Sequence, residues 1–261
     1  MTTERKWSVG ILTMIAGLLL LPILATLIYS FATNWVKTIL PASWTLKWYG
    51  QLVTNSDFMT ATINSLIVGA ASVIVAMVFF LPVIFYINVF DERLKAKVRY
   101  LMVMPYAVPG IVLVTGLVQI YGNLPMPKLI FLILIITALS FPAFYQSLDN
   151  VFMSRDFRGM FEQARMLGER PVSAFVHVML PNIKTGVFVA MLLTFTTGFS
   201  EYVITNIFLN GDYETFKIYM YRLMKANGNA NSVLTVCYFG LLILVAIILM
   251  KLSGKDVKAG K

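Results

Sequence analysis

Few side chains in this sequence have both the type and the setting needed for chemistry. His177 is the one histidine and Cys237 the one cysteine, so a histidine metal site is implausible and no internal disulfide can form. No candidate nucleophile is paired with a base that would activate it. Gly254-Lys255 is followed by Asp256 and lacks the upstream glycine of a phosphate-binding loop. The sequence predicts no catalytic, metal-binding or cofactor-binding residue, and no ATPase site of its own.

Glu201 is the acidic residue that stands out, because it lies in the otherwise apolar stretch Gly198-Phe-Ser-Glu-Tyr-Val-Ile-Thr205. An ionisable group inside a membrane span is costly and normally faces a partner or a hydrated path. A cationic substrate could bind there, with Tyr202 adding cation–π attraction. A structural salt bridge or hydrogen bond to another helix explains the residue equally well. The sequence alone is compatible with both interpretations.

Composition shows what must position these residues. The 261-residue chain is 59% hydrophobic and 13% charged, with a mean hydropathy of +0.79, far from the composition of soluble domains. A bilayer-spanning helix needs roughly 20 apolar residues. Six stretches meet or approach that length: 10–29, 63–86, 101–121, 129–145, 185–209 and 232–250. We therefore expect an all-α integral membrane protein with six transmembrane helices, forming a single domain over residues 1–261.

The basic residues predict the orientation in the membrane. The net charge is +9, but the positions of these residues argue for topology rather than for binding of nucleic acid. With both termini in the cytoplasm, 15 of the 21 basic residues lie inside. The six left outside are Lys37, Lys47, Lys128, Lys217, Arg222 and Lys225. The first apolar stretch is longer than the core of a signal peptide, so we expect it to be retained as a helix.

Two prolines mark the third predicted span. Pro105 and Pro109 are four residues apart and Gly110 follows, so both rings lie on one helix face and each removes a backbone hydrogen bond. This pattern predicts a broken or kinked helix, which either lines a translocation path or bends without touching substrate. In the second span, Asn64 and Ser65 are expected to form hydrogen bonds between helices, with pore lining as the alternative.

The segment between the fourth and fifth spans, about residues 146–184, is polar and charged. From Phe157 to Leu167 the residues Met160, Phe161, Ala164 and Leu167 share one helical face. Gly168 suits a left-handed helix stop, and Pro171 suits the first turn of a second helix. Pro181 is expected to end that helix. The pattern predicts a helix, a sharp turn and a helix at the membrane surface, where a soluble protein could dock or where an amphipathic pair could lie on lipid.

Within that loop the chain resembles a known family. Permease subunits of binding-protein-dependent ATP-binding-cassette importers carry a signature of Glu-Ala-Ala, three residues, Gly, nine residues, Ile, one residue and Leu-Pro. This sequence matches with Glu162, Ala164, Gly168, Leu180 and Pro181, and departs with Gln163 for the first Ala and Val178 for Ile. Six spans with this loop between the fourth and fifth is also the family's plan, so the resemblance extends over most of the chain.

The resemblance implies the type I importer permease fold in a bacterial inner membrane, with the loop docked on a separate ATPase dimer that binds ATP and Mg. It further implies a second permease chain, an extracytoplasmic solute-binding protein and a small-molecule substrate. The contact positions carried over are Glu162, Gln163, Ala164 and Gly168, while Leu180 and Pro181 set the angle at which the fifth span begins. Pro105, Pro109, Glu201 and Tyr202 are the candidate path residues.

The stretch from Gly198 to Gly211 and the Pro-x-x-x-Pro-Gly of the third span look like the polyamine-type branch of these permeases. A polyamine-like cation is the expected substrate, with 2-aminoethylphosphonate, ferric iron or thiamine as alternatives. A secondary transporter or channel that uses Glu201 for ion coupling, and a membrane scaffold without transport, are the rival classes. The loop decides between them, because only an importer needs a docked ATPase.

Overall fold

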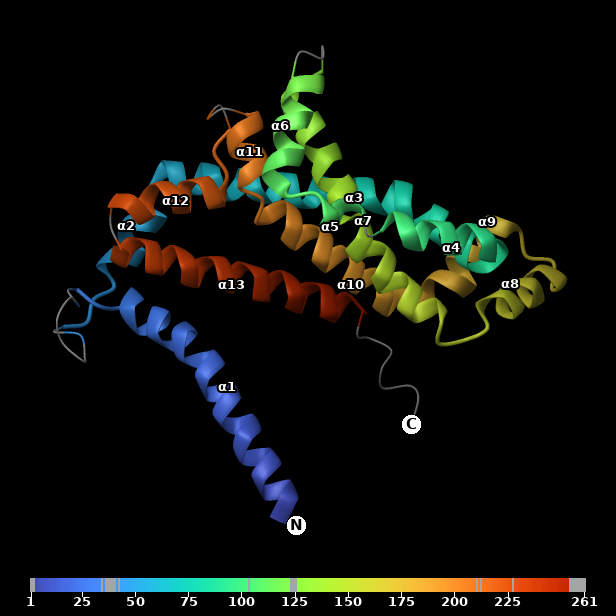
Figure 1. Ribbon diagram of the computed structural model, residues 1–261, viewed down its shortest axis with the longest axis horizontal. Coiled ribbons are helices and arrows are strands. Elements are labelled where there is room, and N and C mark those ends of the chain that lie inside the picture. Colours follow the sequence, from blue (N-terminus) through green and yellow to red (C-terminus); the bar gives the residue numbers. More distant parts are fainter. Residues whose placement is uncertain are drawn as a thin grey trace. The chain divides into compact units, whose positions relative to one another are not determined.

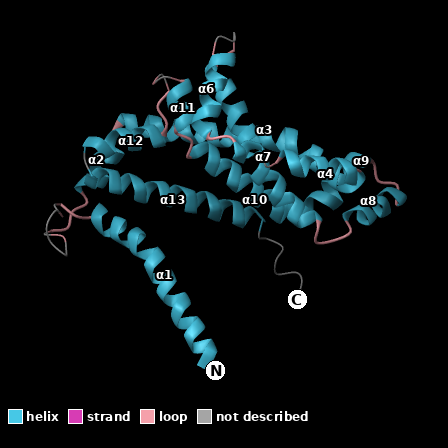
Figure 2. Cartoon of the chain, viewed as in Figure 1, coloured by secondary structure: helices cyan, strands magenta, loops and turns pink. Residues whose placement is uncertain are grey.

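Helices form all the regular elements of the computed structural model, which describes residues 3–33, 35, 41, 43–102, 104–122, 126–209, 211, 213–226 and 228–253 (Figure 2). In those ranges the nearest approach to a sheet is an isolated antiparallel bridge between Ala32 and Trp44. The all-α prediction is confirmed. Lys37 and the segment from Gly254 to Lys261 lie outside the described residues.

Five helical stretches are long and apolar enough to cross a membrane. They are Trp7–Ser30 in α1 (Thr3–Ser30), α3 (Ser56–Phe90), α7 (Lys128–Phe152), Pro171–Phe199, and Gly228–Lys251 in α13 (Gly228–Ser253). A shorter apolar helix, α6 (Gly110–Tyr121), falls in the remaining predicted span. The protein is therefore a helical membrane protein, with α3 and α7 running well past the predicted ends of their spans.

The chain divides into two compact units, Met1–Met59 with Tyr219–Ile243, and Thr60–Ile218 with Leu244–Lys261. In the first unit, two side chains converge on one backbone carbonyl: Trp48 Nε1 in α2 (Lys47–Val53) and Asn229 Nδ2 in α13 each donate to Ala32 O, at 3.0 Å. These bonds hold the end of α1, the start of α2 and the start of α13 together.

In the second unit, α7 packs along α10 (Leu180–Phe199), and the two helices lie side by side in Figure 1. Gly186 makes this approach possible, because a Cβ there would lie 2.8 Å from Val151 Cγ2 and 2.9 Å from Ser147 O. The core around the contact is apolar and includes the fully buried Phe144, Leu148 and Ile183.

The third predicted span is broken, as its prolines predict. After α4 (Glu92–Leu101) come the single turn α5 (Met104–Ala107) and then α6. Pro109 caps α6 in an extended conformation, with φ −56° and ψ 132°. A proline ring disfavours the helical conformation of the residue before it, which is consistent with the break at Val108 and Pro109.

The fifth predicted span, residues 185–209, is wrong as a single helix. α10 ends at Phe199, and a separate short helix, α11 (Val203–Phe208), packs against α6. Between them, Glu201 turns its carboxylate onto the first backbone N–H groups of α11. A side chain that satisfies these donors favours a new helix start over continuation of α10.

Polar residues near the start of α3 act as the sequence predicts. Asn64 Nδ2 donates to Glu214 O at 2.8 Å, and Ser65 Oγ accepts from Phe216 N at 2.8 Å. Phe216 begins α12 (Phe216–Ala226). Ser65 thus bonds α3 to the first residue of α12, as expected of an interhelical bond, while Asn64 bonds α3 to the connection just before α12.

Candidate functional site

The loop between α7 and α10 begins with a short capped helix. α7 ends at Phe152, and α8 (Phe157–Met166) starts after Asp156, whose Oδ1 accepts from Gly159 N at 2.9 Å. An aspartate at this position satisfies one of the free N–H groups at the helix start. The first helix of the predicted pair is confirmed, and Figure 1 shows it with α9 (Pro171–Ala174) at one end of α7 and α10.

An aromatic cluster anchors this loop to the end of α3. The Phe161 ring lies 5.5 Å from that of Phe85 and 5.3 Å from that of Phe90, and the Phe175 ring lies 4.7 Å from that of Phe85. Phe157 on α8 is buried as well. Aromatic side chains contribute large buried areas and preferred edge-to-face contacts. The inner face of the loop is therefore fixed on the helices of the second unit.

The turn after α8 has the geometry that Gly168 predicts. Gly168 has φ +91°, its N–H donates to Arg165 O at 3.1 Å, and Glu169 N donates to Ala164 O at 3.2 Å. These two bonds are those of a Schellman motif, in which a residue in the left-handed region ends a helix. Pro171 then occupies the first turn of α9, as expected.

The tip formed by this turn exposes large apolar side chains. Met166 is 78% exposed, Leu167 87% and Val172 74%. The prediction that Leu167 shares the buried face is wrong, because the helix ends at Met166 and the turn directs the next side chain outward. Charged residues border the tip, and Arg165, Glu169 and Arg170 are all exposed. The tip is therefore an exposed apolar patch bordered by charges, of the kind that marks interaction surfaces on proteins.

The signature residues occupy different faces of α8. Glu162 is exposed and pairs with Arg158 one turn earlier at 2.9 Å, a pair that contributes little to stability in water. Gln163 is exposed too. Ala164 is only 6% exposed and packs in the core cluster. The side chains of Glu162 and Gln163 are therefore accessible, whereas Ala164 packs α8 against its own chain.

Pro181 does not end the second helix, contrary to the prediction. Helical structure runs without a gap from Pro171 to Phe199, through a π-helical turn at Phe175–Met179. In that turn Leu180 N donates to Phe175 O, five residues back. Pro181 has no backbone N–H to donate, and the wider turn before it gives backbone carbonyls other hydrogen-bond partners. Asn182 Nδ2 donates to one of these carbonyls, Val178 O, at 2.7 Å. Leu180 is half-buried and Pro181 exposed where α10 begins.

The four candidate path residues fall at the two helix breaks. Pro105 lies in α5 and Pro109 caps α6, while Glu201 and Tyr202 lie between α10 and α11. Glu201 Oε1 accepts from Ile204 N at 2.8 Å, and Oε2 accepts from both Thr205 N and Thr205 Oγ1 at 2.7 Å. With both oxygens engaged in capping α11, the geometry favours the structural interpretation of Glu201.

Sequence reasoning missed Asp149, at the end of α7. Its carboxylate is buried and paired with Lys95 and Arg99 of α4. The signal was present, because Asp149 is the one acidic residue between Glu92 and Asp156, and the two cations are spaced one helical turn apart. The predicted span ended at Tyr145, which placed Asp149 in a loop where a charge needs no partner.

The family model described as "binding-protein-dependent transport system inner membrane component" matches residues 91–259. The matched region contains the loop between α7 and α10, both helix breaks and Asp149.

Similar proteins come from bacteria and an archaeon. A spermidine/putrescine transport system permease protein PotC homolog of Mycoplasma genitalium is 27% identical over 176 residues, covering 66% of this chain and 61% of that protein. The putrescine transport system permease protein PotI of Escherichia coli is 24% identical over 217 residues, 80% and 76% of the two chains. A probable molybdenum ABC transporter permease protein of Haloferax volcanii is 27% identical over 162 residues, 59% and 60%. The match to the Mycoplasma protein spans less than two thirds of that protein's length.

Proposed function

We infer a function from the family to which the chain belongs, the inner-membrane components of binding-protein-dependent transport systems. The chain is a permease subunit of an ATP-driven importer and forms half of the path through which a small solute crosses the membrane. A second permease chain, not identical to this one, supplies the other half. The orientation proposed from the basic residues puts both termini and the loop between α7 and α10 in the cytoplasm.

The single observation that carries this proposal is the geometry of the loop. Its inner face is fixed by Phe157, Phe161 and Phe175, while Met166 and Leu167 project from a turn closed by Gly168. A protrusion that is rigid at its base can transmit force from a partner to α7 and α10. We propose that the stretch from Glu162 to Pro181 couples the permease to a separate ATPase dimer, which binds ATP and Mg.

Transport then depends on a difference in binding between two states of the ATPase. ATP binding closes the ATPase dimer, and the docked loops follow, so the permease pair changes from an inward-open to an outward-open state. The equilibrium moves only by the difference in affinity of the loop for the two ATPase states. A solute-binding protein delivers the substrate on the outer side, and lipid surrounds the spans.

A polyamine-like cation is the substrate we propose. The support is the pair of polyamine permeases among the similar proteins, together with the sequence pattern near the two helix breaks. The probable molybdenum transporter permease is as similar in sequence as the Mycoplasma protein, at 27% identity each. Solutes other than polyamines must therefore be tested as well. The alternatives are 2-aminoethylphosphonate, ferric iron and thiamine.

A secondary transporter that uses Glu201 for ion coupling is the rival function. Ion coupling needs a carboxylate that can exchange its partners for the ion. The Glu201 oxygens instead accept three hydrogen bonds from Ile204 and Thr205, which would have to break in each cycle. The local geometry therefore favours the importer.

Copurification tests the docking of the loop. Leu167→Glu places a charge on the exposed tip without touching the core, and Gly168→Arg places a bulky cation in the turn. We expect both variants to lose the ATPase during purification in detergent, because the tip no longer fits an apolar groove. Met153→Glu is the matched control, since Met153 is also apolar and exposed, at 59%, but lies before α8. Retention of the ATPase by all three variants would exclude this docking mode.

Uptake tests the transport class and the substrate. The purified permease pair with its ATPase and binding protein is placed in liposomes and offered spermidine, putrescine, thiamine, ferric iron, 2-aminoethylphosphonate and molybdate. We expect ATP-dependent accumulation of the polyamines. Accumulation driven by this chain alone, without nucleotide, would establish the rival class, and no substrate-stimulated ATP hydrolysis in any assembly would indicate a scaffold.

A further inference from the structure

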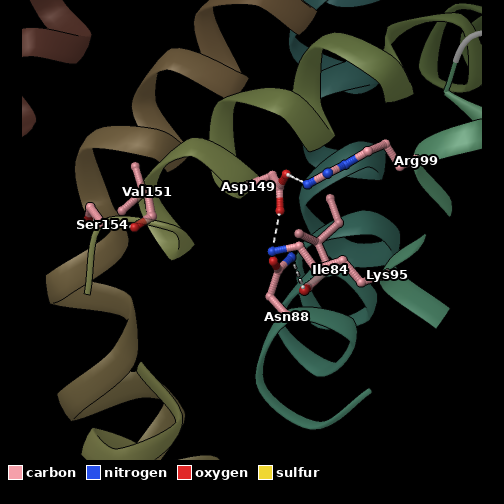
Figure 3. Close-up of polar contacts among 7 residues, drawn as sticks. All are labelled: Ile84, Asn88, Lys95, Arg99, Asp149, Val151 and Ser154. Carbon is pink, nitrogen blue, oxygen red and sulfur yellow. Dashed lines mark hydrogen bonds and ion pairs between the residues drawn. The ribbon is translucent and has the colours of Figure 1, made fainter. Parts of the chain in front are cut away.

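A buried carboxylate at the end of α7 holds two cations of α4. Lys95 Nζ lies 2.8 Å from Asp149 Oδ1, and Arg99 Nη2 donates to Asp149 Oδ2 at 3.2 Å (Figure 3). The Asp149 side chain is 6% exposed, that of Lys95 21% and that of Arg99 56%. Each oxygen of the carboxylate therefore has its own cation, and we call these three residues the Asp149 ion cluster.

The cluster joins two segments that the chain connects only at long range. Asp149 lies in the last turn of α7, three residues before that helix ends and the loop to α8 begins. α4 directly follows α3 and leads into the broken span formed by α5 and α6. Asp91 caps the start of α4, with Oδ1 accepting from Leu94 N at 2.8 Å. The ion cluster is thus a direct link from the loop-bearing helix to the segment that enters the break.

The four basic residues of α4 divide between two faces of the helix. Lys95 and Arg99 face Asp149, on the side where Val98 is buried. Arg93 and Lys97 are exposed on the opposite side. The helix therefore uses two of its charges to fix its orientation against α7, while the other two contact solvent or other molecules. This division provides a charged control position on the same helix.

The Asp149 ion cluster is expected to contribute little to the free energy of folding, so its role is sought elsewhere. The desolvation of a buried ion pair offsets most of its attraction, so apolar residues of similar size often stabilise a fold equally well. What a paired carboxylate adds is directional: it holds partners in a fixed geometry and becomes strongly unfavourable when they separate. A link of this type resists relative movement of α4 and α7.

We propose that Asp149 is a positioning residue that makes α4 move together with the end of α7, so that movement of the loop reaches the broken third span. This inference rests on the proposed coupling function of the loop. It assigns to the Asp149 ion cluster the transmission of that movement to α5 and α6. Without the cluster the ATPase still docks and hydrolyses ATP, but the break at Pro109 no longer follows the loop.

The test measures solute moved per ATP hydrolysed in the complete reconstituted importer. The solute is spermidine, or whichever member of the uptake panel is accumulated. Asp149→Asn keeps the side-chain shape and removes the charge, and we expect the ratio to fall roughly tenfold, in the range by which residues between coupled sites change their coupling. The exposed Lys97→Gln should leave the ratio within about twofold of the original, the small end of that range. An unchanged ratio in Asp149→Asn, whatever the yield of protein, would show a purely structural role and overturn the proposal.

A charge exchange keeps the test decisive if single variants assemble poorly. Lys95→Asp combined with Asp149→Lys restores an opposite-charge pair, while Arg99 is exposed enough to turn to water. We expect the double variant to recover most of the ratio lost in Asp149→Asn or in Lys95→Gln. A double variant that assembles but transports no more solute per ATP than the single variants refutes the proposal. Failure of the importer assignment itself would look different, because the unaltered chain would then show no ATP-dependent uptake.

Discussion

Substitutions of Gly168 test the turn of the loop most directly, because at this position the backbone conformation restricts the residue type and side-chain packing does not. Its φ of +91° lies where L-residues are disfavoured, and a Cβ added there meets nothing within 4 Å. Gly168→Ala therefore changes backbone strain alone, at a cost of about 1–2 kcal/mol. That corresponds to a roughly 5- to 30-fold shift between the closed turn and open alternatives.

A short series measures this cost. Gly168→Asn should be milder than Gly168→Ala, because asparagine tolerates the left-handed region, and Gly168→Val should be the most severe, because a branched Cβ fits that region worst. Thermal unfolding of the purified chain gives the stability of each variant. Titration with the purified ATPase gives the affinity of each variant. For Gly168→Ala the affinity should weaken by at most the same 5- to 30-fold where docking requires the closed turn, with a smaller loss for Gly168→Asn and a larger one for Gly168→Val.

Gly50 is the matched control. It lies inside α2, and a Cβ there also meets nothing within 4 Å, so Gly50→Ala should be neutral or stabilising by roughly 0.5–1 kcal/mol. Equal stability of the alanine, asparagine and valine variants at position 168 would refute the argument from the left-handed turn. A loss of ATPase binding confined to Gly168→Arg would point to a steric role of the glycine instead.

Three further predictions concern the anchoring of the loop and the cap of α11. Phe161→Ala empties the centre of the aromatic cluster and should destabilise the loop by about 3–5 kcal/mol, seen as faster hydrogen exchange over α8; unchanged exchange there would contradict the anchoring. Asp156→Ala removes the cap of α8 and should cost about 0.5–2 kcal/mol in thermal unfolding, whereas Asp156→Asn, which keeps an acceptor, should recover most of it. Glu201→Gln should lower thermal stability by an amount on the order of 1–3 kcal/mol while leaving the KM for cation uptake unchanged, and a raised KM in a stable variant would place Glu201 in the substrate site.

Local backbone chemistry explains what the sequence could predict. Gly168 and Pro171 favour their conformations through φ, and Pro109 disfavours a helical residue before it, so the turn and the broken span could be predicted without any tertiary contact. The amphipathic face of α8 could be predicted from spacing for Phe161 and Ala164, both of which are buried.

The errors arose where tertiary contacts or a change of helix type decide the outcome. Leu167 continues the apolar spacing of α8 but lies after its last turn, and periodicity alone cannot locate that end. A proline often ends the helix that precedes it, but the π-helical turn before Pro181 keeps the chain helical. Asp149 pairs with Lys95 and Arg99, which lie about fifty residues earlier in the sequence. A hydropathy pattern does not predict a tertiary contact of this kind.

The π-helical turn at Phe175–Met179 has a consequence for how the loop and the following span evolve. An α-helix rotates about 100° per residue, so one residue more or less in this turn would rotate everything downstream by that angle. Phe175 would keep its place on α3, but Ile183 and Ala190, which are fully buried, would rotate out of the core. The length of this turn therefore sets the rotation of α10 relative to the loop. Deleting one residue here would disturb the core of α10, whereas a substitution that keeps the length would preserve that rotation, although Phe175 and Met179 are also held by packing.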